Sequence, residues 1–341
     1  MNPPLRVLYA LWHYPHLSES YVRSEIRAVR ALGVDVRVWA QEPGSAPYPS
    51  DVPFGYGELD KACADFRPHL IHTHWLRQPR QMRELRATGL PVTVRGHGFD
   101  SSRKKALKAA RDPMVAAAFP FPQFVPRLPW NRKKIHGVQV GFDATFYPPG
   151  TDKHERKDRR LVTRAGVGIP SKDYNFFFQV AKRCPDHRFV LAICPAYTVE
   201  YYIDEVIAMN AALGNPAEIR LALQHEQVAE LLREAGIYLH TSLPDEPFGM
   251  PISIAEAMAS GCTLIGRRLG ISADYIGDAG VTYTSLDQAV EQVRRTLAWS
   301  DAEWAAASRR SVDRAFGNFE STKSLAPIVA HWREIARARE G

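Results

Sequence analysis

The stretch LRVLYALWHYPHLSESYVRSEIRAVRALGVDVRVWA, residues 5–40, decides the fold. It opens with an unbroken apolar run over 5–12, which is typical of a strand buried in a parallel sheet. Apolar residues at helical spacing follow over 20–32, and Gly33 is the kind of residue that ends a helix. A second apolar run covers 34–40. The order strand, helix, strand predicts the α/β class with a parallel sheet.

The same alternation continues along the chain. Further strands are expected at 68–75, 91–98, 159–166, 187–193, 237–242 and 263–268, and further helices at 57–66, 77–87, 174–183, 226–235, 286–299, 301–315 and 321–338. A length of 341 residues suggests two domains. We therefore expect two facing Rossmann-like doubly wound parallel-sheet domains with a cleft between them, residues 1–140 and 141–341. Whether the final helix, about 321–338, packs back on the first domain is left open.

The cysteines and the apolar segments exclude several classes of protein. The four cysteines are scattered without the spacing of a zinc site, and they predict reduced thiols of a cytosolic protein: Cys63, Cys184, Cys194 and Cys262. No apolar run reaches the roughly 18 residues that a membrane span needs. The apolar N-terminal segment is too short for a signal peptide. We therefore expect a cytoplasmic protein.

Positive charge is concentrated in the first part of the chain. Residues 1–140 carry 21 Lys and Arg against 11 Asp and Glu, a net +10, whereas residues 141–341 carry 23 against 26, a net −3. This asymmetry favours an anionic acceptor, or a loose association with the anionic inner face of a membrane. A basic surface that serves only solvation is the alternative. No nucleic acid partner is expected.

The segment EPFGMPISIAEAMASG, residues 246–261, is the strongest candidate for a binding loop. Its glycine-bearing turn contains Phe248, Gly249, Met250 and Pro251. Backbone N–H groups in such a turn, and at the start of the helix that follows, can bind phosphate or sugar oxygens. Glu256 lies among apolar residues, where a carboxylate can accept two hydrogen bonds from a ribose diol. A purely structural loop and helix is the alternative, but it leaves the cost of burying an acid unexplained.

This segment resembles the signature of glycosyltransferase family 4, a group of retaining enzymes with two facing Rossmann domains (the GT-B fold). The family pattern is Glu, seven residues, Glu and then Ala-Met-Ala-x-Gly, and residues 256–261 match its second half. The resemblance implies that Glu256 holds the ribose of a nucleotide-sugar donor. Phe248 stands where the family has its first Glu, and Glu246 lies two residues earlier. Either Glu246 reaches the sugar from a longer loop, which we favour, or backbone groups alone bind it.

Three further segments resemble the family in the family's order. HYPHLSESYVRSEIRAVRALGVDV (13–36) resembles the N-terminal segment of exopolysaccharide-type members and implies that Ser18 and Glu19 lie on the acceptor side; a helix cap is the alternative. VTVRGHGFD (92–100) resembles the His-Gly-x-Asp segment, which implies that His97 hydrogen-bonds the transferred sugar or a developing charge. VGFDATFYP (140–148) resembles the linker between the domains.

Two more histidines alternate in the segment IHTHW. A strand would place His72 and His74 on one face. The resemblance implies that they pack in the core or contact the acceptor. A zinc site made of His72, His74 and His97 is a third hypothesis.

The diphosphate of a donor requires positive charge, and the resemblance implies an Arg and a Lys after the first strand of the second domain. Lys172 fits the lysine, but Val167 stands at the usual arginine position, so Arg164, expected in a longer loop, is the nearest candidate. The chain contains no Asp-x-Asp, the motif with which transferases of the other common fold hold a metal ion. We expect Lys172, Arg164 and the helix dipole to replace the metal, with no cofactor. The lack of GxGxxG after the first strand disfavours a dinucleotide-dependent dehydrogenase.

These observations together predict a retaining, metal-independent glycosyltransferase. It would take a sugar from a nucleotide diphosphate sugar to a carbohydrate, lipid-linked or small-molecule acceptor, in cell-surface polysaccharide or glycolipid assembly or in natural-product glycosylation. The expected catalytic residues are His97, Glu246, Lys172 and Arg164. The alternatives are a non-catalytic partner subunit with the same fold, and a sugar epimerase or phosphorylase.

Overall fold

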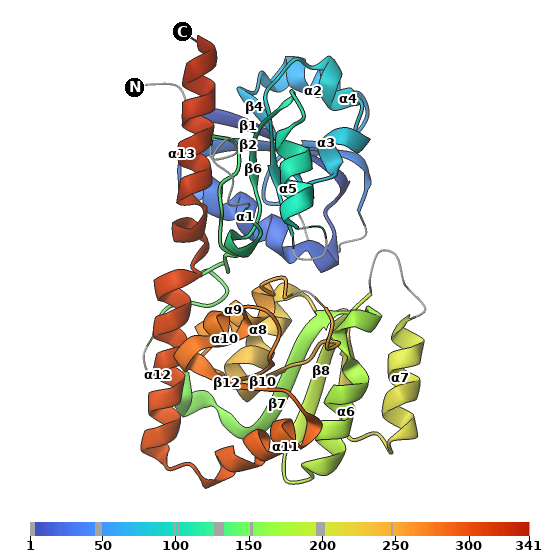
Figure 1. Cartoon of the computed structure of the whole chain (residues 1–341), viewed down its shortest axis with the longest axis vertical. Helices are drawn as coiled ribbons and strands as arrows, with labels where there is room; N and C mark the ends of the chain where they lie inside the picture. Colours follow the sequence, from blue (N-terminus) through green and yellow to red (C-terminus); the bar gives the residue numbers. More distant parts are fainter. Residues whose placement is uncertain are drawn as a thin grey trace. The chain divides into compact units, whose positions relative to one another are not determined.

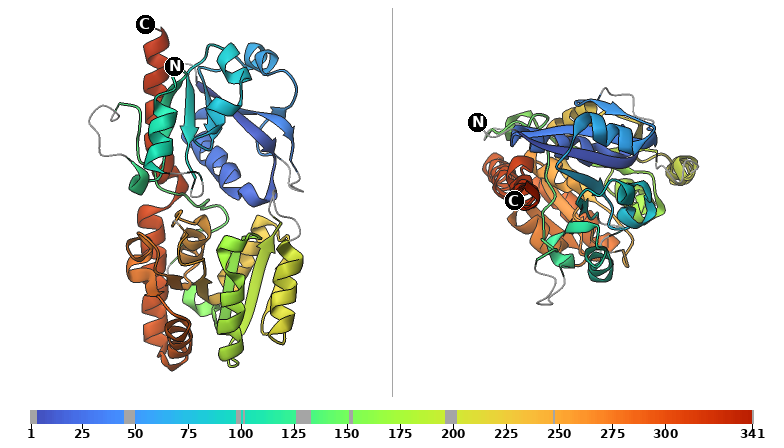
Figure 2. Two further views of the ribbon diagram at one scale, coloured as in Figure 1. Left: turned by 45° about the vertical axis from the view of Figure 1, so that its right-hand side comes forward. Right: turned by 90° about the horizontal axis from the view of Figure 1, so that it is seen from above.

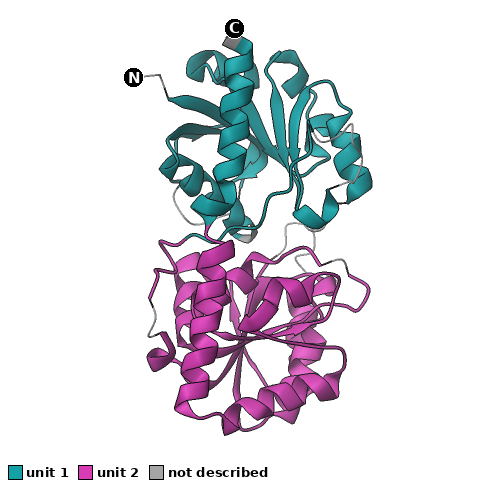
Figure 3. Cartoon of the chain, turned by 60° about the vertical axis from the view of Figure 1, so that its left-hand side comes forward, with its two compact units in different colours: residues 1–143, 321–341 teal, residues 144–320 magenta. Residues whose placement is uncertain are grey.

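The computed structural model describes residues 4–44, 50–97, 100, 102–125, 133–150, 153–195, 202–246 and 248–340. The chain divides into two compact units (Figure 3). Unit 1 combines Met1–Asp143 with Ser321–Gly341, and unit 2 is Ala144–Glu320. The last helix of the chain therefore belongs to the same unit as the first strand.

Unit 1 is built on a six-stranded parallel sheet with the strand order β3-β2-β1-β4-β5-β6 (Figure 1). Its strands are β1 (Leu5–Tyr14), β2 (Val34–Pro43), β3 (Phe54–Gly55), β4 (Leu70–His74), β5 (Val92–Arg95) and β6 (Val115–Phe119). Its helices are α1 (Ser20–Ala31), α2 (Leu59–Phe66), α3 (Gln78–Gln81), α4 (Glu84–Ala87), α5 (Arg103–Ala110) and α13 (Ser321–Glu340), with short 3-10 turns at η1 (Leu17–Glu19) and η2 (Pro122–Phe124).

Helices cover both faces of this sheet. On β1, Val7 and Tyr9 join the core that contains residues of α1 and α13. The residues between and after them, Leu8 and Ala10, join a second core with residues of α2 and α4. Because alternate residues of a strand point to opposite faces, the apolar run at the start of the chain is buried on both.

Unit 2 repeats this plan with the strand order β12-β11-β10-β7-β8-β9, again all parallel. Figure 2 shows helices packed around its strands. Its strands are β7 (Asp158–Val167), β8 (Arg188–Cys194), β9 (Glu218–Leu221), β10 (Ala235–His240), β11 (Thr263–Arg267) and β12 (Gly280–Tyr283). Its helices are α6 (Tyr174–Arg183), α7 (Tyr202–Ala212), α8 (His225–Glu234), α9 (Ile252–Ala259), α10 (Ser272–Ile276), α11 (Leu286–Arg295) and α12 (Asp301–Asn318), with 3-10 turns at η4 (Lys153–Arg156), η5 (Pro170–Lys172), η6 (Gly277–Ala279) and η7 (Thr296–Ala298).

The structure confirms the predicted fold class of two Rossmann-like doubly wound parallel sheets, and it corrects some elements. The expected helix at 77–87 is two short helices, α3 and α4, because Met82 between them has an extended backbone (ψ 93°). The expected strand at 91–98 ends at Arg95. In the described part of the chain, no helix is both long enough and apolar enough to cross a membrane.

Candidate functional site

In unit 2, the loops that follow β7 and β10 are hydrogen-bonded to each other. The Thr241 hydroxyl donates to the Lys172 carbonyl at 2.7 Å, and the Ser242 hydroxyl donates to the Ser171 carbonyl at 2.9 Å. Both loops leave the carboxyl ends of adjacent central strands. In open α/β sheets this edge is where ligands bind.

Arg164 lies beneath this edge and is fully buried. Its Nη1 donates to the Tyr238 hydroxyl at 3.0 Å and its Nη2 to the Thr241 carbonyl at 2.9 Å, whereas its Nε has no hydrogen-bond partner among the described residues. The structure places Arg164 in the strand expected at 159–166, and not in the longer loop that the family resemblance suggested. It is inside β7, because the pairing of β7 with β8 continues to Val167.

Lys172 ends the turn η5 and lies close to Arg164 and to Glu246. Burial, reinforced by the charge of Arg164, lowers the pKa of Lys172 to about 8, and Glu246 opposes this shift. The structure therefore brings together three residues that the sequence predicted from separate segments. Positive charges gathered without full compensation favour an anion.

His240, the last residue of β10, belongs to the same cluster. It is buried, and its Nδ1 has no hydrogen-bond partner in the part of the chain that the structure describes. Burial and the charges of Arg164 and Lys172 hold the pKa of His240 well below its ordinary value, so the ring is neutral. The sequence analysis did not single out this residue. Its signal was a polar residue at the end of the apolar run IYLH.

The predicted binding loop lies beside His240. Phe248 is buried, with ring centroids 6.0 Å from His240 and 5.4 Å from Tyr275. Pro247 lies outside the described residues, and Gly249 is partly buried. Met250 has a positive φ of 48°, which is uncommon for a residue with a side chain and reverses the chain just before α9. Pro251 precedes the first residue of α9, and no described side chain caps that helix.

Glu256 is buried in α9, as its apolar neighbours required, and it has a partner that the sequence analysis missed. Nε2 of His225, the first residue of α8, lies 2.9 Å from its Oε1. The His225 ring packs on Phe146 at a centroid distance of 4.2 Å. This contact holds one carboxylate oxygen of Glu256 and orients the group.

In unit 1, a second polar cluster is buried beneath the carboxyl ends of β4 and β5. His72 and His74 lie on β4 and have no exposed surface, and their Nε2 atoms lie 3.1 and 3.3 Å from Oε1 of Glu25 in α1. The Tyr9 hydroxyl donates to the same oxygen at 3.1 Å, and Arg95 Nε lies 3.7 Å from Oε2. Burial would raise the pKa of Glu25, but His74 and His72 outweigh it and hold that pKa well below its ordinary value.

His97 follows β5 and contacts this cluster through His74. Its Nε2 lies 2.8 Å from Nδ1 of His74, and the two rings stack. Its backbone N–H donates to Asp100 Oδ1 at 2.9 Å, and Leu76 N–H donates to Oδ2 of the same carboxylate at 2.5 Å. The Tyr21 ring lies 4.5 Å from the His97 ring. Asp100 therefore holds the backbone at His97 and at Leu76.

The three histidines of the zinc hypothesis do not form one group of candidate metal ligands. Among the described residues, the atoms close enough to share an ion belong to Glu25, His72 and His74, and His97 is not in that group. Glu25 lies within the segment 13–36 that resembles the family. It could have been found from its position among the apolar residues of α1, the same signal that identified Glu256.

The remaining acceptor-side residues lie at the turn after β1. Ser18 is within η1, but its side chain lies outside the described part. Glu19 is partly buried, and burial raises its pKa to about 8. Glu19 precedes the first residue of α1 and makes no side-chain capping bond. An acid whose pKa is this high is typical of a functional site.

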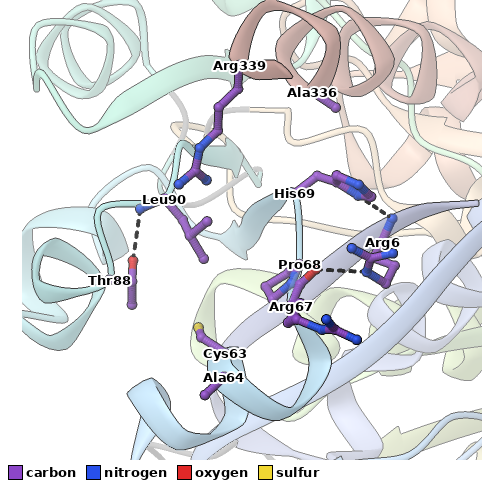
Figure 4. A pocket seen from close by; sticks show the side chains of 10 residues that line it. All are labelled: Arg6, Cys63, Ala64, Arg67, Pro68, His69, Thr88, Leu90, Ala336 and Arg339. Atoms are coloured by element: carbon purple, nitrogen blue, oxygen red, sulfur yellow. Dashed lines mark hydrogen bonds between the residues drawn. The ribbon is translucent and has the colours of Figure 1, made fainter. Parts of the chain in front are cut away.

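A hollow of about 520 Å³ lies at the opposite edge of the unit 1 sheet (Figure 4). Arg6, Arg67, His69 and Arg339 are among the residues that line it. His69 precedes β4 and Arg6 is near the start of β1, so this is the amino edge of the sheet. Since ligands of parallel sheets bind at the carboxyl edge, this hollow is not the candidate site.

Comparison with known proteins agrees with this architecture. Residues 151–303 match the family described as glycosyl transferases group 1. An MMP alpha-(1->4)-mannosyltransferase of Mycolicibacterium hassiacum is 21% identical over 213 residues, which cover 61% of this chain and 50% of that protein. A GDP-Man:Man(3)GlcNAc(2)-PP-Dol alpha-1,2-mannosyltransferase of Xenopus laevis is 27% identical over 136 residues, which cover 37% and 27%. The chain thus spans half or less of the length of these curated relatives.

The crystal structure of Anabaena HepE in complex with UDP and glucose is similar to the whole chain, with a TM-score of 0.72 at 14% identity over 95% of this chain and 99% of that one. Residues 151–303 belong to the glycosyl transferases group 1 family, which corresponds to glycosyltransferase family 4, and the chain has the GT-B fold. The family resemblance drawn from the sequence is confirmed.

Proposed function

We propose that this protein is a retaining glycosyltransferase. Unit 2 binds a nucleotide diphosphate sugar, and unit 1 binds the acceptor whose hydroxyl receives the sugar. The observation that carries the proposal is the cluster of Arg164, Lys172 and His240 at the carboxyl edge of the unit 2 sheet. This cluster lies within the segment that matches the family.

The donor's diphosphate fits this cluster because its negative charge would neutralise the positive charges of Arg164 and Lys172. Backbone N–H groups of Phe248–Met250 and the positive end of the α9 dipole add further attraction for an anion. When the bond between the anomeric carbon and the diphosphate breaks, negative charge grows on the leaving oxygen. Positive groups already in place stabilise this charge without reorganisation. Glu246, whose charge acts on Lys172, would orient the sugar or the lysine.

Glu256 would bind the nucleoside of the donor through its ribose. His225 occupies Oε1, so Oε2 is the oxygen that a ribose hydroxyl would meet. The HepE structure contains UDP, whereas the name of the Xenopus relative specifies GDP-mannose, so the base requires a direct test.

On the acceptor side, His97, Glu19 and Ser18 are the groups that would contact the reacting hydroxyl or the transferred sugar. An anionic acceptor, such as a lipid-linked sugar diphosphate, fits the net +10 of residues 1–140. Such an acceptor belongs to cell-surface polysaccharide or glycolipid assembly, which we favour over natural-product glycosylation.

A nucleotide-sugar screen tests the proposal. One UDP-, GDP- or ADP-sugar should raise Tm, and a ligand at 100 times its Kd stabilises by about 2.7 kcal/mol. That donor should then release nucleoside diphosphate only when an acceptor is added, with retention at the anomeric carbon. Binding without turnover across lipid-linked and soluble acceptors would support the non-catalytic subunit. Conversion of the sugar without any acceptor would support an epimerase.

A further inference from the structure

Three buried side chains of unit 1 bring atoms that can bind a metal ion to one position. Glu25 comes from α1, and His72 and His74 come from β4. Nε2 of His72 lies 3.1 Å from Glu25 Oε1, and Nε2 of His74 lies 3.3 Å from the same oxygen. Because alternate residues of a strand point to one face, β4 presents both rings to the side that α1 covers.

The two Nε2 atoms are near the carboxylate but have no hydrogen-bond partner among the described residues. Buried polar atoms are normally paired, so two such atoms side by side require an explanation. Burial lowers the pKa of His72 to about 4, so this ring is neutral at neutral pH. A neutral imidazole nitrogen without a proton is a ligand for a metal ion.

The other nitrogen of each ring, Nδ1, does have a partner that can accept a hydrogen bond. His72 Nδ1 lies 2.8 Å from the Thr93 hydroxyl, which can itself donate to the Ile71 carbonyl at 3.5 Å. His74 Nδ1 lies 2.8 Å from Nε2 of His97, a ring that burial keeps neutral by lowering its pKa well below the ordinary value. With a proton on each Nδ1, both Nε2 atoms carry lone pairs. Histidines that bind a metal ion donate their second N–H in this way.

We propose that Glu25, His72 and His74 bind one zinc ion, through Oε1 and the two Nε2 atoms, and that this ion links α1 to β4 in the core of unit 1. Two ligands of a tetrahedral zinc ion, each about 2.0–2.1 Å from the metal, are about 3.3 Å apart. The distances of 3.1 and 3.3 Å fit this spacing. The Tyr9 hydroxyl, 3.1 Å from Glu25 Oε1, can fill the fourth position. Imidazole ligands favour zinc over magnesium or calcium.

A proton on His74 is the competing explanation, because a charged imidazolium would also lower the pKa of Glu25. The Arg95 guanidinium favours this alternative, since it repels a cation, but its Nε lies 3.7 Å from Oε2 and not from the oxygen that we assign to the ion. One proton would serve one nitrogen and leave His72 Nε2 unpaired. A single zinc ion serves both nitrogens, which is why we favour it.

Such a zinc ion would be structural. Its ligands lie in unit 1, so it would not take the place of Arg164 and Lys172 of unit 2 at the diphosphate. Because all three ligands are buried, a chelator should not remove the ion from the folded protein, and removal should require unfolding. The proposal does not depend on the proposed function.

Metal analysis of the full chain, produced with zinc in the medium and without a histidine tag, tests the proposal. The wild type should retain stoichiometric zinc after dialysis against EDTA. His72→Gln and His74→Gln should each lose it, whereas His187→Gln, which removes a buried histidine of unit 2, should keep it. A wild type without zinc, or variants of both β4 histidines that retain it, would overturn the site. No donor or acceptor is present, so failure here is distinct from failure of the proposed function.

X-ray absorption at the zinc edge needs only the wild type, so it remains decisive if the variants do not fold. We expect scattering from two imidazole rings and from oxygen ligands, with no sulfur. A sulfur ligand, or a spectrum without imidazole, would place the zinc elsewhere and overturn the site. Unfolding in urea with EDTA and refolding without zinc should lower the urea midpoint of the wild type, and added zinc should restore it.

Discussion

Lys172 is a residue whose charge changes close to neutral pH. Most surface lysines stay protonated to pH 10, but burial beside Arg164 lowers the pKa of Lys172 to about 8. The ammonium is the form that attracts a diphosphate. If Lys172 binds the diphosphate as proposed, donor binding is linked to the protonation of this one residue.

We expect donor affinity to be constant below pH 7 and to weaken as pH rises through 8. A bound diphosphate favours the charged lysine and raises its pKa, so binding above pH 8 takes up a proton. Calorimetry in buffers of different ionisation enthalpy measures this uptake. Lys172→Arg stays charged and should show a flat profile over the same range. An equally flat profile in the wild type would remove Lys172 from the diphosphate site.

Glu256→Gln should weaken donor binding while the fold persists. Loss of a charge-assisted hydrogen bond to ribose costs about 1.5–3 kcal/mol, or roughly ten- to hundredfold in Kd. His225→Gln is the companion variant, because it disturbs the orientation of Glu256 without removing the carboxylate. Calorimetry with the donor found in the screen measures both. Wild-type donor affinity in Glu256→Gln would mean that Glu256 only contacts His225 and does not bind the ribose.

At the scale of elements, α5 has two distinct faces. Ala106, Ala109 and Ala110 are buried in a core cluster of unit 1. Arg103, Lys104, Lys105 and Lys108 are exposed on the other side. The apolar face is therefore used internally, and attachment of this helix to a membrane could only be electrostatic.

Replacing these four exposed cations of α5 with Ser should reduce binding to anionic vesicles. Each Lys or Arg near an anionic leaflet contributes roughly 1 kcal/mol, and the effect should vanish at high salt. The matched control removes the same number of charges from unit 2, at the exposed residues Lys182, Arg268, Arg295 and Arg309. Co-sedimentation at low and high salt measures binding. If the wild type binds anionic vesicles no better than neutral ones, the basic surface has no membrane role.

Trp332 of α13 should contribute strongly to the stability of unit 1. Its indole is fully buried and donates to Thr93. Trp332→Ala should cost about 3–5 kcal/mol of unfolding free energy through the cavity and the lost hydrogen bond. Arg337→Ala, an exposed change on the same helix, should stay within about 0.5 kcal/mol. Urea titrations compare the two, and equal effects would mean that α13 packs loosely.

The elements that the sequence predicted well are the buried ones. Long apolar runs such as those of β1 and β10 are informative because burial on both faces requires them. The sequence did not predict short edge strands of the two sheets such as β6 and β9. β6 reads VAAAF and β9 reads EIRL, so neither has the length nor the pattern that separates a strand from a loop.

At the scale of the whole molecule, the sequence predicted the local motifs of the candidate site but not the contacts between distant residues. Single segments with a motif, such as 246–261, could be recognised locally. Partnerships such as Glu25 with His74, or Glu256 with His225, join residues that are 49 and 31 positions apart, and only the fold brings them together. Their distances and protonation states therefore could not be predicted from the sequence.

Activity of the whole molecule should survive EDTA. In the proposed site, Arg164 and Lys172 would supply the charge that a divalent ion supplies in other transferases, and the chain has no Asp-x-Asp. Turnover should be unchanged after chelation and dialysis, with re-added magnesium or manganese as the control. Restoration of lost activity by either ion would show that the diphosphate needs a metal.

The return of α13 to unit 1 bears on how the protein is made. A ribosome adds residues from the amino end, yet the core that surrounds Tyr9 and Val29 lacks Leu325, Ile328 and Trp332 until the final helix has emerged. Unit 2, residues 144–320, is then already synthesised in full. The first unit to be translated is therefore the last to be completed, and its unfinished apolar surface needs protection for most of the time that synthesis takes.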